Sequence, residues 1–352
     1  MMARMKQLEL GIIGFGRIGA EHAGWISQSS HVRVTEVYDA TPARRDLAAA
    51  RGLATTESLD LFLTSPKVDA VLISVPTSMH FDLAMQCLRA GKHVMIEKPM
   101  TLDLPQAKLL AEEAKALGLV ISVFHNRRWD VDFLTVQKAI AAGTFGRVFN
   151  VESRLGQWGS CVGPAATEYR PNWRNEGSFG GGGLYDWGSH FLDQLWRLML
   201  PAKPVHVFAQ LRGNVWSSDC DDFARVLVNF DNEAVGLVEI NTTTTRPLPR
   251  WHIDGTEGSA FSPYSLEFDT TFWASLRFTG KTQQAHVTLP MADGGLSELQ
   301  IWDHFAAAVR GQGKPAVTVE SVLPTMCLLD AARVSSLSGK AIAVANDVEW
   351  VL

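Results

Sequence analysis

The sequence predicts a two-domain protein, with an α/β domain in residues 1–125 and an α+β domain in residues 126–352. Three observations lead to this prediction. A chain of 352 residues is long enough for about two hydrophobic cores. Up to residue 124, apolar runs alternate with helix-forming segments, which is typical of a doubly wound parallel sheet. Beyond residue 148, strand-like segments follow one another without intervening helices, which indicates a large, mostly antiparallel sheet.

In the first domain, strands are expected at residues 8–13, 32–38, 69–75, 92–96 and 119–124. Helices are expected after residue 19 through 28, from 42, near 57–64, from 76–80 to 90, and at 104–117. The run at 69–75 is apolar through its centre, as in a strand that is buried on both faces.

In the second domain, a helix is expected at 132–142, a longer strand at 148–154 and a helix at 184–200. Strands follow at 205–211, 223–230, 234–241 and 250–254, with a turn at 255–258 and further strands to about residue 289. The last two helices are expected near 296–310 and 319–337. The chain shows no internal repeat.

Composition excludes several classes of function. Hydrophobic residues make up 46% and charged residues 20%, which is ordinary for a globular protein. A net charge of -5 argues against a nucleic-acid partner. No apolar run reaches the roughly 18 residues of a membrane span, and the basic start is read as leading into a strand, not as a signal peptide. Four separated cysteines favour free thiols over a metal site. We expect a cytoplasmic protein without metal, nucleic-acid or membrane partners.

The clearest motif lies between the first expected strand and helix. Residues 14–19 match G-x-G-x-x-G, and Asp39 lies twenty residues beyond Gly19 at the end of the second strand. Gly14 permits the tight turn, Gly16 lets the backbone approach a pyrophosphate, and Gly19 lets the helix pack on the strand. The N-terminus of the helix then offers N–H groups to phosphate oxygens. This context predicts a dinucleotide-binding Rossmann domain.

The acid at residue 39 favours NAD over NADP. A carboxylate there accepts hydrogen bonds from the adenosine ribose hydroxyls and repels a 2′-phosphate. Arg44 and Arg45 follow closely and could instead bind such a phosphate, although they fit equally well as exposed residues of the next helix. NADP therefore remains the alternative cofactor.

Chemically capable side chains cluster where successive strands end. These clusters are Ser74 to His80, Glu97 to Pro99, and residues 125–129. Ligands bind beyond the carboxyl ends of the strands in such sheets. Each cluster alone would indicate a turn or a surface ion pair, and His80 fits a turn as well as a cofactor contact. Their placement at successive strand ends favours a binding site.

A glycine run, residues 180–183, precedes the helix expected at 184–200. At about 100° per residue, one face of this helix is polar and carries Asp186, His190, Asp193 and Arg197. Read alone, it is the solvated face of an amphipathic helix. Downstream of a dinucleotide domain, the same face is a candidate for catalysis. The glycines would then let helix, cofactor and substrate approach closely. Asp193 would either orient His190 or meet solvent.

Taken together, the motif at residues 14–19, the turn at 76–80, Glu97-Lys98-Pro99 and Asp186-x-x-x-His190 resemble the Gfo/Idh/MocA oxidoreductases. This family includes glucose–fructose oxidoreductase and inositol dehydrogenases. Residues 125–130 and 184–186 are similar to a scyllo-inositol dehydrogenase-like subgroup. The resemblance implies an N-terminal Rossmann domain and a C-terminal open-faced sheet that joins subunits into a homodimer or homotetramer.

The resemblance also implies roles for individual residues. Lys98, Asp186 and His190 would form a catalytic set, and the Lys98–Pro99 bond would be cis. The residues implied in cofactor binding are Gly14, Phe15, Gly16, Arg17, Ile18, Gly19, Asp39, Ser74, Pro76, His80, Glu97 and Lys98. Those implied near the substrate are Asn126, Arg127, Trp173 and Arg174. The seven histidines without ligand-spaced partners are assigned no role: His22, His31, His93, His206, His252, His286 and His304.

These residue types suit the oxidation of a secondary alcohol. An imidazole such as His190 takes the hydroxyl proton, Lys98 stabilises the developing alkoxide, and Asp186 binds a further hydroxyl or orients the site. A sugar, inositol or sugar derivative is the expected substrate. Two alternatives remain: a glycosidase that retains NAD and acts by oxidation and elimination, and a non-enzymatic dinucleotide sensor. The sequence names neither the substrate nor the physiological direction of the reaction.

Overall fold

The computed structural model describes residues 6–161, 173–265, 268–283, 285–345 and 347–350. The chain forms two compact units. The first contains residues 1–126 and 296–323, and the second contains residues 127–295 and 324–352. The sequence-based boundary between residues 125 and 126 remains a proposal. The units of the structure differ from it by placing residues 296–323 with the N-terminal segment.

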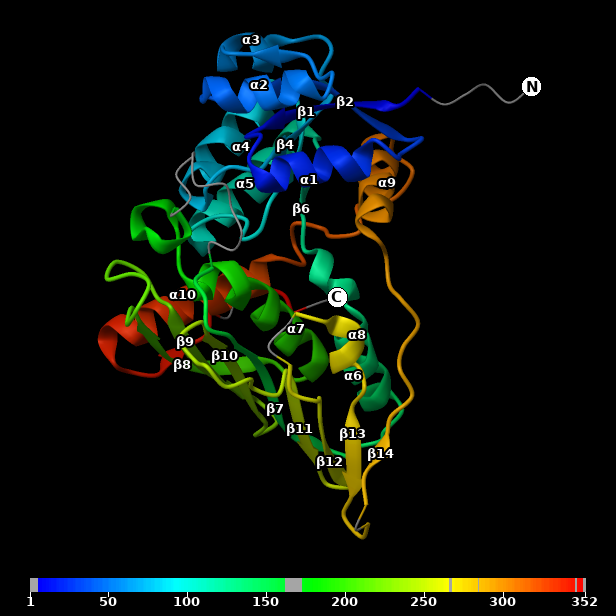
Figure 1. Cartoon of the computed structure of the whole chain (residues 1–352), viewed down its shortest axis with the longest axis vertical. Helices are drawn as coiled ribbons and strands as arrows, with labels where there is room; N and C mark the ends of the chain where they lie inside the picture. The colour runs from blue at the N-terminus through cyan, green and yellow to red at the C-terminus, as the bar shows by residue number, and fades with distance from the viewer. Residues whose placement is uncertain (1–5, 162–172, 266–267, 284, 346, 351–352) are drawn as a thin grey trace, which may run out of the picture. The chain divides into compact units, whose positions relative to one another are not determined.

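The first unit is built on a six-stranded parallel sheet of order β3-β2-β1-β4-β5-β6 (Figure 1). Its strands are β1 (Leu8–Ile13), β2 (Val32–Tyr38), β3 (Thr55–Thr56), β4 (Ala70–Ile73), β5 (His93–Ile96) and β6 (Ile121–Val123). Its helices are α1 (Arg17–Ile26), α2 (Pro42–Ala50), α3 (Leu59–Thr64), η1 (Thr77–Met79), α4 (His80–Arg89), α5 (Leu104–Leu117) and α9 (Glu298–Val309). The strand order reverses direction between β1 and β4, where open α/β sheets bind their ligands. The predicted doubly wound Rossmann fold is confirmed.

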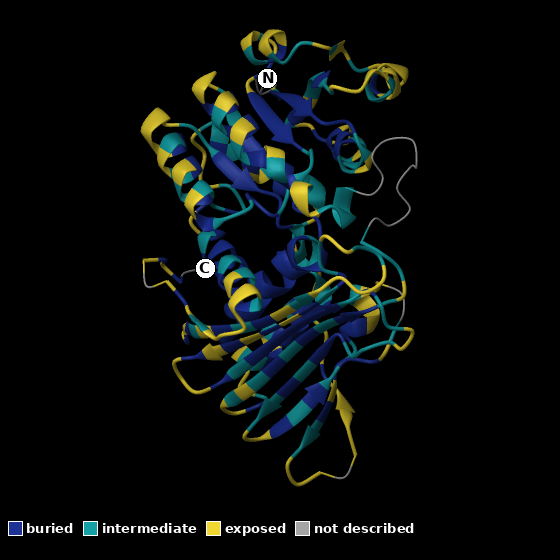
Figure 2. Ribbon diagram, turned by 90° about the vertical axis from the view of Figure 1, so that its left-hand side faces the viewer, coloured by how far each residue is buried: buried dark blue, intermediate teal, exposed yellow. Residues whose placement is uncertain are grey.

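Burial explains why these segments form strands and helices. Every residue of β1 and β4 is buried, as expected for central parallel strands with helices on both faces. Figure 2 shows these strands in dark blue, while the outer sides of the helices are yellow. Local signals set the helix ends. The Asp103 side chain accepts a hydrogen bond from the Gln106 amide at the start of α5, and Gly118 ends the helix at φ +67°.

Helix α9 completes the first unit although it lies far along the chain. It begins with a capping box formed by Ser297 and Gln300, and it packs beside α1 (Figure 1). Trp302 of α9 is fully buried. Farther along, Ser122 of the edge strand β6 donates a hydrogen bond to the Val317 carbonyl oxygen at 2.7 Å. Residues 296–323 therefore cover one helix and one sheet edge of the Rossmann unit.

The second unit is built on a nine-stranded sheet of order β14-β13-β12-β11-β7-β10-β9-β8-β15. Its strands are β7 (Val148–Gly156), β8 (Pro204–Arg212), β9 (Phe223–Phe230), β10 (Val235–Asn241), β11 (Trp251–Gly255), β12 (Gly258–Phe261), β13 (Arg277–Gly280), β14 (Val287–Thr288) and β15 (Ile342–Ala343). Its helices are α6 (Val131–Ala141), η3 (Trp173–Asn175), η4 (Gly177–Phe179), η5 (Leu184–Gly188), α7 (Ser189–Met199), α8 (Thr270–Trp273) and α10 (Leu323–Ser338). Among the described strands of this sheet, only β7 and β10 pair in parallel, so the predicted mostly antiparallel sheet is confirmed.

One face of this sheet carries the core of the unit. Along β9, alternate residues point inward and are buried, whereas Arg225, Leu227 and Asn229 point outward and are exposed. Helix α7 packs on the inner face against β7 and β10. Figure 2 shows the resulting mixture of dark blue, teal and yellow along the strands. Within the described ranges, no helix has the length and apolar character needed to cross a bilayer.

Candidate active site

The glycine-rich loop after β1 has the shape that a dinucleotide needs. Gly14 has φ +90°, and a Cβ atom there would lie 2.7 Å from the Ser74 carbonyl oxygen. A Cβ atom on Gly19 would lie 2.2 Å from the Gly14 carbonyl oxygen, so α1 packs directly on the loop. In contrast, a Cβ atom on Gly16 would meet nothing within 4 Å. The open space at Gly16 adjoins the start of α1, which has no side-chain cap.

The Asp39 carboxylate at the end of β2 is held by backbone groups. Its two oxygens accept hydrogen bonds from the Phe15 and Thr41 amides, both at 2.8 Å. Arg45 donates to the Asp39 carbonyl oxygen at 2.8 Å and pairs with Glu57 at 3.5 Å. The carboxylate is thus fixed beside the glycine-rich loop, and the Arg45 guanidinium is engaged by protein oxygens. These residues fit an adenosine ribose without a 2′-phosphate.

The remaining loop residues face in different directions. The Phe15 side chain is buried, and only its backbone amide faces Asp39. Arg17 is exposed and pairs with Glu21 at 2.9 Å, and Ile18 is half-buried. If Phe15 and Arg17 contact a dinucleotide, they would therefore do so mainly through their backbone atoms.

The Glu97-Lys98-Pro99 turn follows β5. The Lys98–Pro99 peptide bond is cis, as the resemblance implies. Glu97 lies with Oε1 2.7 Å from His22 Nε2, and its Oε2 accepts the Lys98 backbone amide at 3.1 Å. Burial acts to raise the pKa of Glu97, but the hydrogen bond from His22 and the charge of Lys98 outweigh it and hold the pKa below its ordinary value.

His80 contacts the same turn from its other side. Its ring is 1% exposed, and its two nitrogens lie 2.9 Å from the carbonyl oxygens of Val75 and Pro99. Burial lowers the pKa of His80. The side chain therefore joins the turn after β4, which contains Ser74 and Pro76, to the turn after β5. This is a structural contact, and the expected cofactor contact of His80 stays a proposal.

In the second unit, the glycine run packs tightly against protein atoms. A Cβ atom on Gly181 would lie 2.5 Å from the Arg174 carbonyl oxygen. Gly182 has φ +107°, and a Cβ atom there would lie 2.3 Å from Asp221 Oδ1. These glycines therefore let neighbouring loops of the chain approach closely. The sequence had suggested that they make room for cofactor and substrate.

Asp221 holds the start of the segment that follows the glycine run. Its Oδ2 accepts the Leu184 amide at 2.7 Å, and its carbonyl oxygen accepts the Gly183 amide at 2.8 Å. Burial raises the pKa of Asp221 to about 7. Residues 184–188 form a π-helical turn before α7, where the sequence predicted one continuous helix. Such turns are frequent at functional sites.

Four of the predicted site residues belong to this π-helical turn, the loop before it and the start of α7. Arg174 Nε lies 3.4 Å from Asp186 Oδ1, and the Arg174 guanidinium stacks 4.4 Å from the Trp173 ring. His190 follows Asp186 by one helical turn and is 4% exposed. Trp173, Arg174, Asp186 and His190 therefore line one stretch of the second unit.

Arg127 lies beside the same turn. The Arg127 guanidinium is 4.8 Å from the Trp187 ring and pairs with Asp130 at 3.2 Å. Burial raises the pKa of Asp130 to about 7, although the Arg127 charge opposes this. Asn126 belongs to the first unit, where its amide donates to Glu298 at 3.4 Å.

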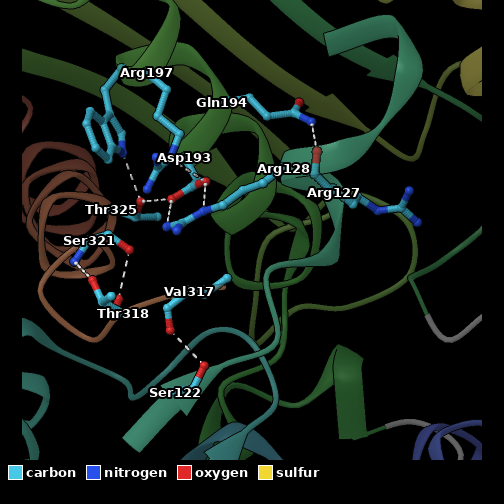
Figure 3. A network of polar contacts seen from close by, with 11 residues as sticks. Ser122, Arg127, Arg128, Asp193, Gln194, Arg197, Val317, Thr318, Ser321 and Thr325 are labelled. Atoms are coloured by element: carbon cyan, nitrogen blue, oxygen red, sulfur yellow. Dashed lines mark hydrogen bonds and ion pairs between the residues drawn. The ribbon is translucent and has the colours of Figure 1, made fainter. Parts of the chain in front are cut away.

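The polar face of α7 is not solvated. Asp193 is 1% exposed and accepts hydrogen bonds from Arg128 at 2.7 and 2.8 Å, from Arg197 at 3.1 Å and from Thr325 at 2.8 Å (Figure 3). Trp196 donates to the same threonine at 3.0 Å. The alternative reading of a solvated helix face is therefore wrong for Asp193 and Arg197, because Asp193 binds Arg128 and Thr325 and so fixes α7 to α10.

Sequence reasoning assigned no individual role to three residues that hold these elements in place: His22, Arg128 and Asp221. Arg128 lies in the cluster at residues 125–129, but its partner Asp193 is 65 residues away, and the partners of His22 and Asp221 are also distant in the chain. Among the described residues, no group of three histidine, cysteine or acidic side chains could hold a metal ion.

Comparison with known proteins places the chain in a family. Residues 8–125 match the model described as an oxidoreductase family with an NAD-binding Rossmann fold, and residues 133–261 match the GFO/IDH/MocA C-terminal domain. An uncharacterized Escherichia coli oxidoreductase, YdgJ, is 37% identical over 264 residues, which are 74% of this chain and 72% of that protein.

Two further relatives cover almost the whole chain. The scyllo-inositol 2-dehydrogenase (NADP(+)) IolW of Bacillus subtilis is 25% identical over 95% of both chains. The crystal structure of an NAD-binding protein from Listeria innocua is 29% identical, with a TM-score of 0.84 over 96% of this chain and 97% of that one. The chain therefore belongs to the Gfo/Idh/MocA family and is an NAD(P)-dependent oxidoreductase that acts on CH–OH groups.

Proposed function

We propose that the protein transfers a hydride between a secondary alcohol of a sugar, inositol or sugar derivative and NAD. The polar set on the π-helical turn and α7 carries this proposal: Asp186, paired with Arg174, lies one turn before His190. A polyol offers a hydroxyl group to each of these side chains, and the Trp173 ring offers an apolar face. The Bacillus subtilis relative that covers 95% of the chain is named for inositol oxidation, which favours the same substrate class.

Each side chain of the proposed catalytic set has a separate task. When bound, NAD accepts the hydride. His190 takes the hydroxyl proton as general base, because an imidazole titrates near working pH. Lys98 donates a hydrogen bond to the substrate oxygen and stabilises its developing negative charge. Asp186 accepts a hydrogen bond from a neighbouring hydroxyl and holds Arg174, which with Arg127 and Asn126 forms the proposed substrate contacts.

We propose NAD as the preferred cofactor, with NADP as the alternative. Asp39 carries the preference, because its charge is fixed beside the glycine-rich loop by two backbone amides. The name of the Bacillus subtilis relative specifies NADP, so the cofactor is tested directly with both dinucleotides.

The decisive experiment combines a substrate panel with two variants. Inositols, aldoses, keto-sugars and aminosugar derivatives are tested with NAD and NADP while NADH or NADPH absorbance is recorded. Lys98→Ala and His190→Ala should each lower kcat by about 10²-fold or more, and His190→Ala should leave NAD affinity unchanged. Lys115→Ala and His304→Ala, which change exposed residues, are the matched controls.

Other outcomes would contradict the proposal. Turnover within a few-fold of wild type in Lys98→Ala or His190→Ala would remove that residue from the catalytic set. Hydrolysis of a glycoside without net NADH formation would assign the protein to NAD-retaining glycosidases. NAD binding without turnover of any compound in the panel would favour a sensor.

We further propose that the outer face of the nine-stranded sheet joins two copies of the chain. Phe208, Leu227 and Leu237 stand in register across β8, β9 and β10 and form an apolar row on this face. Glu239 and Arg225, which pair at 2.9 Å, border the row. Leu227→Lys should shift the molecular mass measured by light scattering from a dimer or tetramer to a smaller species. An unchanged mass would place the interface elsewhere.

A further inference from the structure

His22 of α1 is a fully buried histidine with two hydrogen-bond partners in the first unit. The Trp302 indole N–H donates to His22 Nδ1 at 3.1 Å, and His22 Nε2 lies 2.7 Å from Glu97 Oε1. An indole N–H can only donate, so Nδ1 accepts and carries no proton. The proton of the neutral ring is then on Nε2, which donates to Glu97. The contacts select one tautomer.

This histidine connects a distant helix to the turn that contains Lys98. Glu97 uses its other oxygen to accept the Lys98 backbone amide at 3.1 Å. A chain of hydrogen bonds therefore runs from Trp302 through His22 and Glu97 to the backbone of Lys98. The His22 ring has apolar surroundings. The centroids of the Phe124 and Trp25 rings lie 4.3 and 5.0 Å from its own centroid. In such surroundings each hydrogen bond is stronger and more directional than in water.

We propose that His22 and Trp302 are positioning residues for Lys98, acting through the Glu97 carboxylate. This inference rests on the proposed catalytic role of Lys98. The chain fixes the rotamer of Glu97, and Glu97 in turn fixes the backbone from which the Lys98 side chain projects. A shift of about 1 Å in a catalytic group is enough to lower a rate by about 10²-fold, so the orientation of this turn matters for catalysis.

The charges around Glu97 define what the loss of His22 would do. Among the described residues, the titratable groups that interact electrostatically with its carboxylate are His22 from α1, Lys98 beside it and His80 from α4. Burial raises the pKa of Glu97, whereas the hydrogen bond from His22 lowers it. Without His22, burial is opposed mainly by Lys98, and the pKa of Glu97 moves up. Glu97 would then take up a proton at a higher pH than in the wild type.

The first test follows the Glu97 carboxyl group directly and needs no substrate. Carbon-13 NMR of protein labelled at glutamate gives the Glu97 titration in wild type, His22→Leu and His22→Gln, with Glu97→Gln to assign the signal. In His22→Leu the pKa should rise above the ordinary glutamate value. In His22→Gln it should stay near the wild-type value, because the amide N–H can donate to Glu97. Trp25→Phe, which changes only a ring contact, is the control.

The outcome separates positioning from packing. Equal Glu97 titrations in wild type and His22→Leu would overturn the inference, because they would show that His22 only fills space. If His22→Leu fails to fold, Trp302→Phe decides. Loss of its donor should change the nitrogen-15 spectrum of His22, which in wild type shows a proton on Nε2 and none on Nδ1. A proton on Nδ1 of the wild type would also overturn the inference.

The second test uses turnover of the substrate found by the panel. His22→Leu should lower kcat by about 10-fold or more with little change in the KM for NAD. The acid limb of its profile of kcat against pH should move to higher pH. His22→Gln should recover most of the loss. In a Lys98→Ala background, His22→Leu should have almost no further effect on kcat. An additive loss would overturn the inference, whereas an active Lys98→Ala enzyme would instead overturn the proposed function.

Discussion

The turn at Glu97 and helix α7 are both held by carboxylates, but these carboxylates have different partners. In the first unit, Asp39 and Glu97 accept hydrogen bonds from backbone amides, and Glu97 is also bound by a histidine. In the second unit, Asp193 lies between two arginines (Figure 3). Backbone amides and a neutral ring orient a carboxylate without adding charge, whereas arginines neutralise it. The first arrangement sets the position of a turn, and the second locks a helix against its neighbours.

The comparison predicts its largest effect on stability at Asp193. Asp193→Asn leaves Arg128 and Arg197 buried without their shared counter-charge, which should lower the free energy of unfolding by about 3–5 kcal/mol. Urea denaturation followed by circular dichroism measures this loss. Asp293→Asn, which changes an exposed carboxylate of the second unit, should stay within about 0.5 kcal/mol of wild type. A loss below about 1 kcal/mol for Asp193→Asn would show that hydrogen bonds to the two arginines hold the helix, and that the negative charge of Asp193 does not.

Asp221 tests whether the type of partner matters more than the unit. It belongs to the second unit, as Asp193 does, but a backbone amide binds its carboxylate, as in the first unit. Its pKa of about 7 in the folded protein exceeds the ordinary aspartate value of 3.8. The folded state therefore binds its proton more tightly than the unfolded chain, so stability falls as the pH rises from about 4 to about 7.

Asp221→Asn should remove this part of the pH dependence. The asparagine oxygen can still accept the Leu184 amide, and no charge forms at high pH. The variant should therefore gain stability relative to wild type between pH 5 and 8, on the order of 1–2 kcal/mol at the upper end. Thermal unfolding across this range measures the difference. A difference that does not change with pH would mean that the Asp221 carboxyl group titrates alike in folded and unfolded chains.

Local signals predicted most of the fold. The bounds of the strands at 32–38 and 223–230 and of the helix at 104–117 agree with the structure, because apolar periodicity and end caps lie within each segment. The cis bond at Lys98–Pro99 followed from the family resemblance. Phosphate-loop glycines were recognisable because their roles depend on a strand, a turn and a helix that are adjacent in sequence.

Long-range contacts account for what the sequence did not predict. The first residue of the π-helical turn at 184–188, Leu184, is bound by Asp221, which lies 37 residues away in the chain. His22 contacts Glu97 and Trp302 across 75 and 280 residues, so its position three residues after Gly19 gave no sign of a role. Asp193 seemed free to meet solvent because Arg128 lies 65 residues before it. The role of a polar residue in a helical pattern therefore depends on the partner that the fold places beside it.

The smallest expected effect concerns Asp39, where the first unit holds a carboxylate by amides alone. Asp39→Ser removes the charge beside the glycine-rich loop. NAD should bind about 10-fold more weakly, because charge-assisted hydrogen bonds to the ribose are lost, and the ratio of NADP to NAD affinity should rise. Fluorescence titration with both dinucleotides measures the change, with Asp46→Ser of the exposed α2 surface as control. If wild type and Asp39→Ser prefer the same dinucleotide by the same ratio, Asp39 does no more than brace the Phe15 amide, and selectivity must come from Arg44 or Arg45.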